Sequence, residues 1–177
     1  MITLDNLKTI CPQASVGRMA LFLEALNDAM DEYHISENVQ RETAFIAQVA
    51  HESGGFHYVR ELASGEAYEG RKDLGNIEPG DGVRYKGRGL IQITGRANYG
   101  ACSVALFGYP SRLLTAPELL EDPGNACRSA AWFWQTHGLN ELADAGDFLR
   151  ITKRINGGTN GLPDRMAYFE RAKEVLA

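Results

Sequence analysis

The sequence has few cysteines, and it lacks the long apolar runs of membrane proteins. Its three cysteines, Cys11, Cys102 and Cys127, lie far apart and form no CxxC pair. We therefore expect free, mostly buried thiols rather than a disulfide framework or a zinc ribbon. No apolar run approaches the 18 or so residues that cross a bilayer, and residues 1–10 do not read as a secretory signal. These features predict a cytoplasmic protein without membrane insertion.

Several motifs that bind metals, nucleotides or acyl groups are also missing. In the segment that begins with His51 and Glu52, the second histidine of a HExxH zinc motif is replaced by Gly55. Gly87 and Gly89 are not followed by the other glycines of a dinucleotide fingerprint, and there is no G-x-S-x-G nucleophile motif. The formal charge of −5 argues against nucleic acid as a partner. We therefore expect neither a metal nor a cofactor.

What is present is a chain of 177 residues, 44% hydrophobic and 23% charged, which is enough for one domain with a real core. Apolar residues recur at helical spacing over 15–33, with Ser15 as a candidate N-cap. Further helices are predicted over about 36–53, 101–107, 123–137, 147–155 and 163–176. Residues 56–100 are rich in glycine, and 90–94 resemble a short strand. The prediction is a mainly α, lysozyme-like α+β fold: a helical body and a small β-containing lobe at about 56–100 that frame a cleft.

Glu52 is the most informative single residue. On a helical wheel the apolar stripe from Phe45 to Ala50 spans roughly 140°, and Glu52 falls about 20° outside it. It therefore borders the core and lies in the last turn of its helix, where the helix dipole disfavours negative charge. Both conditions favour a protonated carboxyl, which is what a general acid needs. The alternative is a solvated glutamate or one paired with Arg88 or Arg165.

A glycosidase needs a second carboxylate, and the segment after Glu52 offers several. Glu61 lies nine residues further on, across the Gly54-Gly55 turn, so the two carboxyls can face each other across one cleft. Inverting enzymes separate the pair by about 6.5–9.5 Å and retaining enzymes by about 5–5.5 Å. The other candidates in this segment are Glu66, Glu69, Asp73, Glu78 and Asp81.

Several segments together resemble glycoside hydrolase family 19, the family of plant-type chitinases, and most of all its short phage endolysin branch. The matching stretches are AHESGGF at 50–56, YKGRGLIQIT at 85–94, NYG at 98–100, INGG at 155–158 and DR at 164–165. They occur in the family's order and cover about residues 40–176. The resemblance therefore extends over most of a single catalytic domain, taken here as residues 1–177.

The resemblance implies a role for each matching residue. Glu52 matches the general acid and Glu61 the general base of compact members, with Thr94 as the hydroxyl residue that helps to hold the attacking water. Residues expected to bind substrate are Tyr85, Gln92, Asn98, Asn156 and Arg165. Arg165 is also expected to lie close to the acidic pair, where its charge would keep the base ionised. The implied mechanism is inverting and needs no cofactor.

The chain also departs from the plant members. Ala97 stands where they carry a tyrosine, and several of their long loops and all of their disulfides are missing. A shorter, more open cleft suits peptidoglycan, so we expect a monomeric endolysin that cleaves its N-acetylmuramic acid/N-acetylglucosamine backbone. Such an enzyme would accumulate in the cytoplasm and reach the wall after release by a holin. The alternatives are an endochitinase and, from another class, a cell-wall carbohydrate-binding protein without catalysis.

Overall fold

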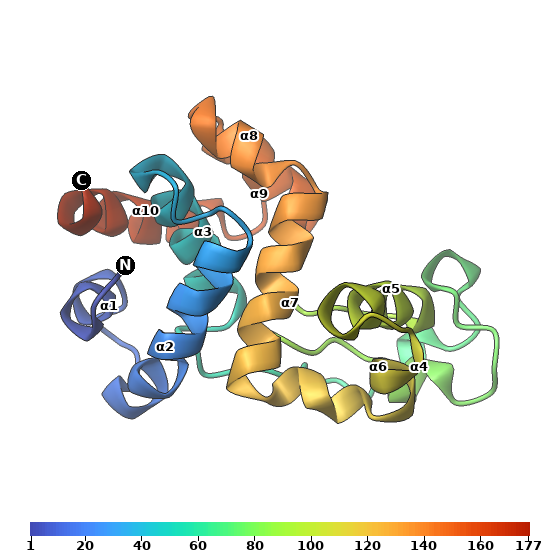
Figure 1. Cartoon of the computed structure of the whole chain (residues 1–177). Helices are drawn as coiled ribbons and strands as arrows, with labels where there is room; N and C mark the ends of the chain where they lie inside the picture. Colours follow the sequence, from blue (N-terminus) through green and yellow to red (C-terminus); the bar gives the residue numbers. More distant parts are fainter.

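The computed structural model describes residues 1–177, and its regular secondary structure is almost all helical (Figure 1). The α-helices are α1 (Leu4–Ile10), α2 (Val16–Glu32), α3 (Val39–Glu52), α4 (Asp81–Arg84), α5 (Arg96–Phe107), α6 (Ser111–Thr115), α7 (Pro123–Thr136), α8 (Leu139–Asp144), α9 (Phe148–Asn156) and α10 (Leu162–Leu176). Three 3-10 helices lie at η1 (Glu66–Tyr68), η2 (Lys72–Leu74) and η3 (Pro117–Glu121). The predicted mainly helical class is confirmed.

The larger body is a bundle in which α10 packs along α3, α2 packs against α7, and α1 bridges α2 and α10. A core of 31 buried residues fills it. The N- and C-termini lie on the same side of this bundle (Figure 1). Ser15 caps α2 as predicted, because its side chain accepts a hydrogen bond from the amide of Arg18. None of the helices is both long and apolar enough to span a membrane.

Helix α3 runs through the bundle and places Glu52 at its C-terminal end. Residues 43–50 are all buried, so the helix is enclosed by the bundle rather than lying on its surface. It begins after the cap Asn38, two to three residues later than the sequence indicated, and ends at Glu52. Gly54 and Gly55 then adopt positive φ angles, and a Cβ on Gly55 would lie 2.8 Å from Ala14 Cβ. The chain can therefore turn sharply after Glu52 because a side chain is absent there.

The smaller lobe contains η1, η2, α4, α5 and α6 around a second core of seven buried residues. The predicted strand over 90–94 is wrong. Arg88 and Ile93 bond to each other in both directions, at 3.1 and 2.7 Å, so residues 88–93 fold back on themselves. Positive φ angles at Gly89 and Gln92 make this turn. Only isolated bridges, Arg60 with Arg88 and Arg88 with Ile93, represent β-structure in the lobe.

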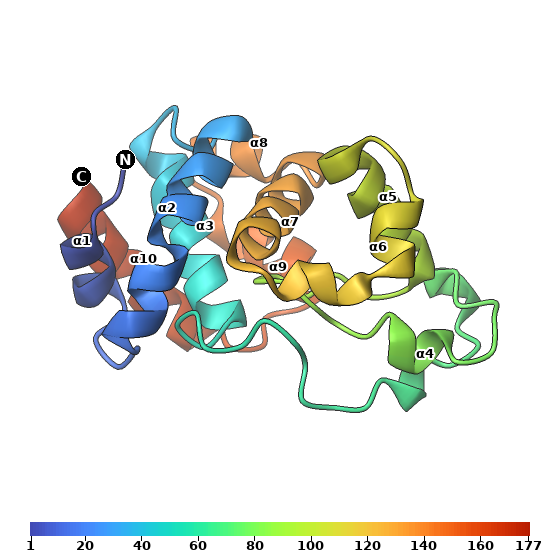
Figure 2. The ribbon, with the colours of Figure 1, turned by 60° about the horizontal axis from the view of Figure 1, so that its bottom comes forward.

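Helix α7 connects the two parts of the molecule. Trp132 and Phe133 are partly buried and pack against both cores. The segment that follows α3 runs past the end of α7 into the small lobe (Figure 2). All three cysteines are buried and unpaired, as predicted. Burial raises the pKa of Cys11 and of Cys102 to about 12, so these thiols stay protonated.

Candidate active site

Glu52 ends α3 and is held by an arginine from α10. Arg165 Nη1 lies 2.6 Å from Glu52 Oε1, and the Arg165 side chain is only 2% exposed whereas that of Glu52 is 23% exposed. Of the two partners considered from the sequence, the structure therefore selects Arg165. A positive charge therefore lies directly against Glu52. This contact differs from the expectation that the charge of Arg165 would act on Glu61, the expected base.

Arg165 is fixed by further polar contacts that are buried in the bundle. Its Nη1 donates to Gln48 Oε1 at 2.6 Å, and its Nε donates to the Asn160 carbonyl at 3.1 Å. Gln48 in turn donates to the Thr152 hydroxyl on α9 at 2.9 Å. Three helices thus cooperate to hold one guanidinium against Glu52. Because Arg165 has almost no exposed surface, its guanidinium contacts Glu52, Gln48 and Asn160 and not the open cleft, so its expected part in binding substrate stays a prediction.

A second polar pair joins the same two helix ends. His51 Nδ1 lies 2.6 Å from Asp164 Oδ2, so the neighbours of Glu52 and Arg165 are also paired. The ring of His51 packs on Gly161, where a Cβ would lie 2.3 Å from Cε1. This contact requires a residue without a side chain, and Gly161 has a φ of 73°. The start of α10 is therefore locked to the end of α3 by two adjacent contacts.

Glu61 is held on the small lobe by the loop that surrounds it. Its Oε2 accepts hydrogen bonds from the Gly87 amide at 3.0 Å and from the Tyr68 hydroxyl at 3.1 Å. Its backbone amide bonds the Gly87 carbonyl at 2.9 Å. The other oxygen, Oε1, is buried and has no hydrogen-bond partner in the protein. A buried acceptor of this kind is costly unless a ligand or water satisfies it.

Tyr68 is a site residue that sequence reasoning missed. Burial, together with the negative charge of Glu61, raises the pKa of its hydroxyl. The hydroxyl therefore remains a donor to the carboxylate at neutral pH. Tyr68 lies in a short 3-10 helix within the glycine-rich segment, where no periodicity indicates which side chains meet. Its spacing of seven residues from Glu61 carried no recognisable signal.

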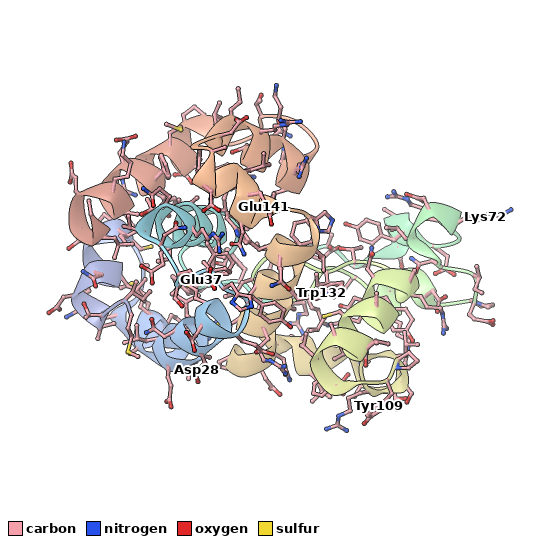
Figure 3. All side chains as sticks on the ribbon, turned by 45° about the horizontal axis from the view of Figure 1, so that its top comes forward. Asp28, Glu37, Lys72, Tyr109, Trp132 and Glu141 are labelled. Carbon is pink, nitrogen blue, oxygen red and sulfur yellow. The ribbon has the colours of Figure 1, made fainter.

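Glu52 and Glu61 line the same cleft, which has a volume of ≈ 420 Å³. This lies within the range of roughly 300–1,000 Å³ that is usual for ligand sites. A second pocket of ≈ 190 Å³ adjoins it and shares Gln92. Trp132 lies on α7 between the two parts of the molecule, whereas Lys72 lies at the far end of the small lobe (Figure 3). The lining of the first pocket is Glu52, Tyr58, Arg60, Glu61, Leu62, Ala63, Tyr68 and Gln92, and that of the second is Leu74, Gln92, Ile93, Thr94, Asn98, Trp132, Phe133 and His137.

The structure brings some of the other predicted residues to these pockets and leaves others out. Gln92 lines both, and Thr94 and Asn98 line the second. Asn156, at the end of α9, lines neither, although its Nδ2 is buried without an acceptor. Tyr85 does not reach the cleft: it is 1% exposed, packs in the small core, and donates its hydroxyl to the Leu114 carbonyl at 2.8 Å. This buried placement argues against the predicted role of Tyr85 in binding substrate.

The remaining acidic candidates have other partners or lie outside the cleft. Glu69 accepts from the amides of Gly80 and Gly82, and Asp81 pairs with Arg96 at 2.8 Å. Asp73 pairs with Arg71, while Glu66 and Glu78 are exposed. Of the six carboxylates considered as the partner of Glu52, only Glu61 lines the same pocket.

A cleft with two carboxylates, one beside an arginine and one held by neutral donors with a free oxygen, is the arrangement of an acid/base glycosidase. The helical fold and this pair define the class of protein. Residues 32–145 match the model of the class I chitinases, glycoside hydrolase family 19, and the chain belongs to that family.

Individual relatives support the same assignment. A Haemophilus influenzae protein described as containing a glycosyl hydrolase family 19 domain is 31% identical, with 75% of this chain and 78% of that protein covered. An Arabidopsis thaliana endochitinase is 36% identical over 84% of this chain, which spans 50% of that protein's length. The crystal structure of a bacterial family 19 chitinase superposes with a TM-score of 0.81, at 24% identity, covering 99% of this chain and 95% of the other. That likeness shows the fold.

Proposed function

We propose that this chain hydrolyses the N-acetylmuramic acid/N-acetylglucosamine backbone of bacterial peptidoglycan by an inverting acid/base mechanism. The observation that carries the proposal is the pair of carboxylates in one cleft, of which Glu61 keeps one oxygen without a partner. In this mechanism the Glu61 carboxylate accepts a proton from a water that attacks the sugar carbon, while Glu52 donates a proton to the leaving glycosidic oxygen.

The surroundings of each carboxylate support these roles. Hydrogen bonds from the Gly87 amide and the Tyr68 hydroxyl hold the Glu61 carboxylate in one orientation, as a base requires. Glu52 becomes a carboxylate when it gives up its proton, and Arg165 is already in place to stabilise that charge. The arginine therefore contributes more after proton transfer begins than before it. This is the differential stabilisation on which catalysis depends.

A chitin-type polymer is the second candidate substrate, because the Arabidopsis relative is named an endochitinase. The short length of the chain does not indicate which polymer is the substrate, since the bacterial chitinase of similar structure is matched over 95% of its length. Peptidoglycan is favoured by the open surroundings of the carboxylates, where the rim residue Leu62 is 84% exposed. Bulky lactyl and peptide substituents can be accommodated at such a rim.

The deciding experiment is digestion of purified Gram-negative sacculi and of glycol chitin, followed by borohydride reduction and mass spectrometry of the soluble fragments. Reduced N-acetylmuramic acid ends identify a muramidase, and reduced N-acetylglucosamine ends identify cleavage of the other bond. Release from glycol chitin alone would overturn the peptidoglycan proposal. Binding to sacculi without new reducing ends would instead support a non-catalytic wall-binding protein. The anomer formed first, followed by proton NMR, tests inversion.

The proposed route to the wall, synthesis in the cytoplasm followed by holin-type release, is part of the same proposal. Three buried, unpaired cysteines suit folding in a reducing compartment. Fractionation of producing cells before and after expression of a holin tests it. Activity found in the periplasm before the holin is expressed would contradict this route.

A further inference from the structure

Arg60 is a charged residue of the cleft that the acid/base mechanism does not use. It immediately precedes Glu61, and both residues line the same pocket. Its backbone is fixed on both sides, because the Gly89 amide bonds the Val59 carbonyl at 2.8 Å and the Glu61 amide bonds the Gly87 carbonyl at 2.9 Å. The side chain therefore projects from a rigid part of the lobe, one residue from the proposed base.

The guanidinium of Arg60 is weakly engaged within the protein. Its one ion-pair contact is with Glu121 at 3.7 Å, and its side chain is 58% exposed. Glu121 is bound more closely by Arg88, whose Nε lies 3.1 Å from the other carboxylate oxygen. An exposed pair at 3.7 Å contributes little to stability. Arg60 thus keeps its donors and its charge available at the cleft.

The other charges that face this pocket do not repeat the role of Arg60. Glu52 is paired with the buried Arg165, and Glu61 is held by Gly87 and Tyr68. Lys86, on the same lobe, donates to the Ala63 carbonyl at 3.2 Å. Arg60 is therefore the exposed cation that lines the pocket. A guanidinium in this position is suited to a carboxylate, which it can bind with two parallel hydrogen bonds.

Chitin and peptidoglycan differ in whether they carry carboxylates. Chitin is a neutral polymer of N-acetylglucosamine, whereas peptidoglycan carries carboxylates on its peptide stems and, where a stem has been removed, on the lactyl group. We propose that Arg60 binds these carboxylates next to the scissile bond and is a specificity-determining residue for an anionic glycan. The inference rests on the proposed function and names the residue that selects the substrate.

The test compares Arg60→Gln with Arg112→Gln, which makes the same change of charge at an exposed arginine on α6, outside both pockets. The readout is the ratio of kcat/KM on intact sacculi to kcat/KM on glycol chitin, at low salt. We expect Arg60→Gln to lower this ratio about threefold to fivefold, as for the loss of one exposed ion pair. Arg112→Gln should leave it at the wild-type value. Added salt should lower the wild-type ratio and affect Arg60→Gln less.

Chemically altered sacculi identify the carboxylate. When the carboxyl groups are converted to amides with carbodiimide and ammonia, wild-type enzyme should fall to the rate of Arg60→Gln. Amidase-treated glycan, which has lost its peptides and exposes the lactyl carboxylate, separates the two sources: a difference that persists there assigns the lactyl group, and one that disappears assigns the peptide stem. If the wild-type enzyme digests sacculi and Arg60→Gln keeps the wild-type ratio, the inference about Arg60 is overturned and the proposed function stands. Failure of the wild type to digest sacculi would overturn the proposed function as well.

Discussion

Gly87 and Glu61 are in contact in two ways that leave no room for a side chain at Gly87. The Gly87 amide donates to Glu61 Oε2 at 3.0 Å, and a Cβ on Gly87 would lie 2.6 Å from that same oxygen. The same Cβ would also lie 3.1 Å from Gln92 Oε1. The backbone of Gly87 does not have a positive φ angle, so its conformation does not require glycine. Glycine is needed here because the Glu61 carboxylate occupies the space of a side chain.

We predict that Gly87→Ala lowers kcat at least tenfold, because the methyl group displaces Glu61 from the donors that orient it. Misplacement of a catalytic group by about 1 Å can cost on the order of 100-fold. The control is Gly124→Ala on α7, where a Cβ would meet nothing within 4 Å. Gly124 is the second residue of α7, and alanine has the higher helix propensity, so this variant should be equally active and at least as stable. Steady-state kinetics and circular dichroism check both, and full activity of Gly87→Ala would refute the role of this contact.

Glu52→Gln should abolish hydrolysis while the fold is kept. The amide fills the same space but has no proton to transfer, and loss of general acid catalysis costs about 10²–10⁴-fold. Product release from sacculi and from glycol chitin is the measurement, with near-ultraviolet circular dichroism as the control for folding. Turnover at the wild-type rate would exclude Glu52 as the acid.

Glu61→Gln should cause a comparable loss, and Glu69→Gln provides the contrast. Glu69 accepts from the amides of Gly80 and Gly82, so its replacement should cost stability of the small lobe. The activity per folded molecule should then stay close to wild type. Thermal unfolding and active-fraction kinetics separate the two effects. If Glu69→Gln or Glu66→Gln were folded and inactive while Glu61→Gln retained activity, the base would be misassigned.

Much of the helical body follows from the sequence because its signals are local. The apolar period over 15–33 and the hydroxyl of Ser15 identify α2 to within a residue at each end. The Gly54-Gly55 pair marks the end of α3, and with it the position of Glu52. The short helices α1 and α8 do not follow from the sequence, since seven and six residues carry too little periodicity to be recognised.

Less of the small lobe follows from the sequence, because its contacts are not local. Apolar and polar residues alternate in the run from Ile91 to Thr94, which is typical of a strand. In the structure a positive φ at Gln92 turns it instead, and Leu90 and Ile91 join the large core while Ile93 joins the small one. Sequence spacing likewise cannot show that Tyr68 reaches Glu61 or that Tyr85 points into the core.

The ion pair of Asp81 and Arg96 predicts a pH dependence of stability. Asp81 is buried, and the hydrogen bonds from Arg96 hold its pKa below the usual value. Because the folded pKa is lower than the unfolded value of about 3.9, the pair stabilises the fold above that pH, and the contribution is lost as the pH falls through the folded pKa. Asp81→Asn should cost about 2 kcal/mol at pH 7 and less at pH 3. Urea unfolding at both pH values checks this, and a cost that does not shrink at pH 3 would contradict it.

Arg165 should tolerate no replacement by lysine, although the charge is conserved. The guanidinium meets Glu52, Gln48 and the Asn160 carbonyl from one planar group, and an ammonium presents a single point of charge instead. We expect Arg165→Lys to lower kcat about tenfold to 100-fold with a smaller change in KM, because the developing charge on Glu52 loses its oriented partner. Arg171→Lys is the matched control: Arg171 lies on the same helix and donates to the Ile10 carbonyl at 2.7 Å, away from the carboxylates. It should lose stability but keep its kcat. Equal losses of kcat in the two variants would mean that Arg165 supports the helix rather than the acid.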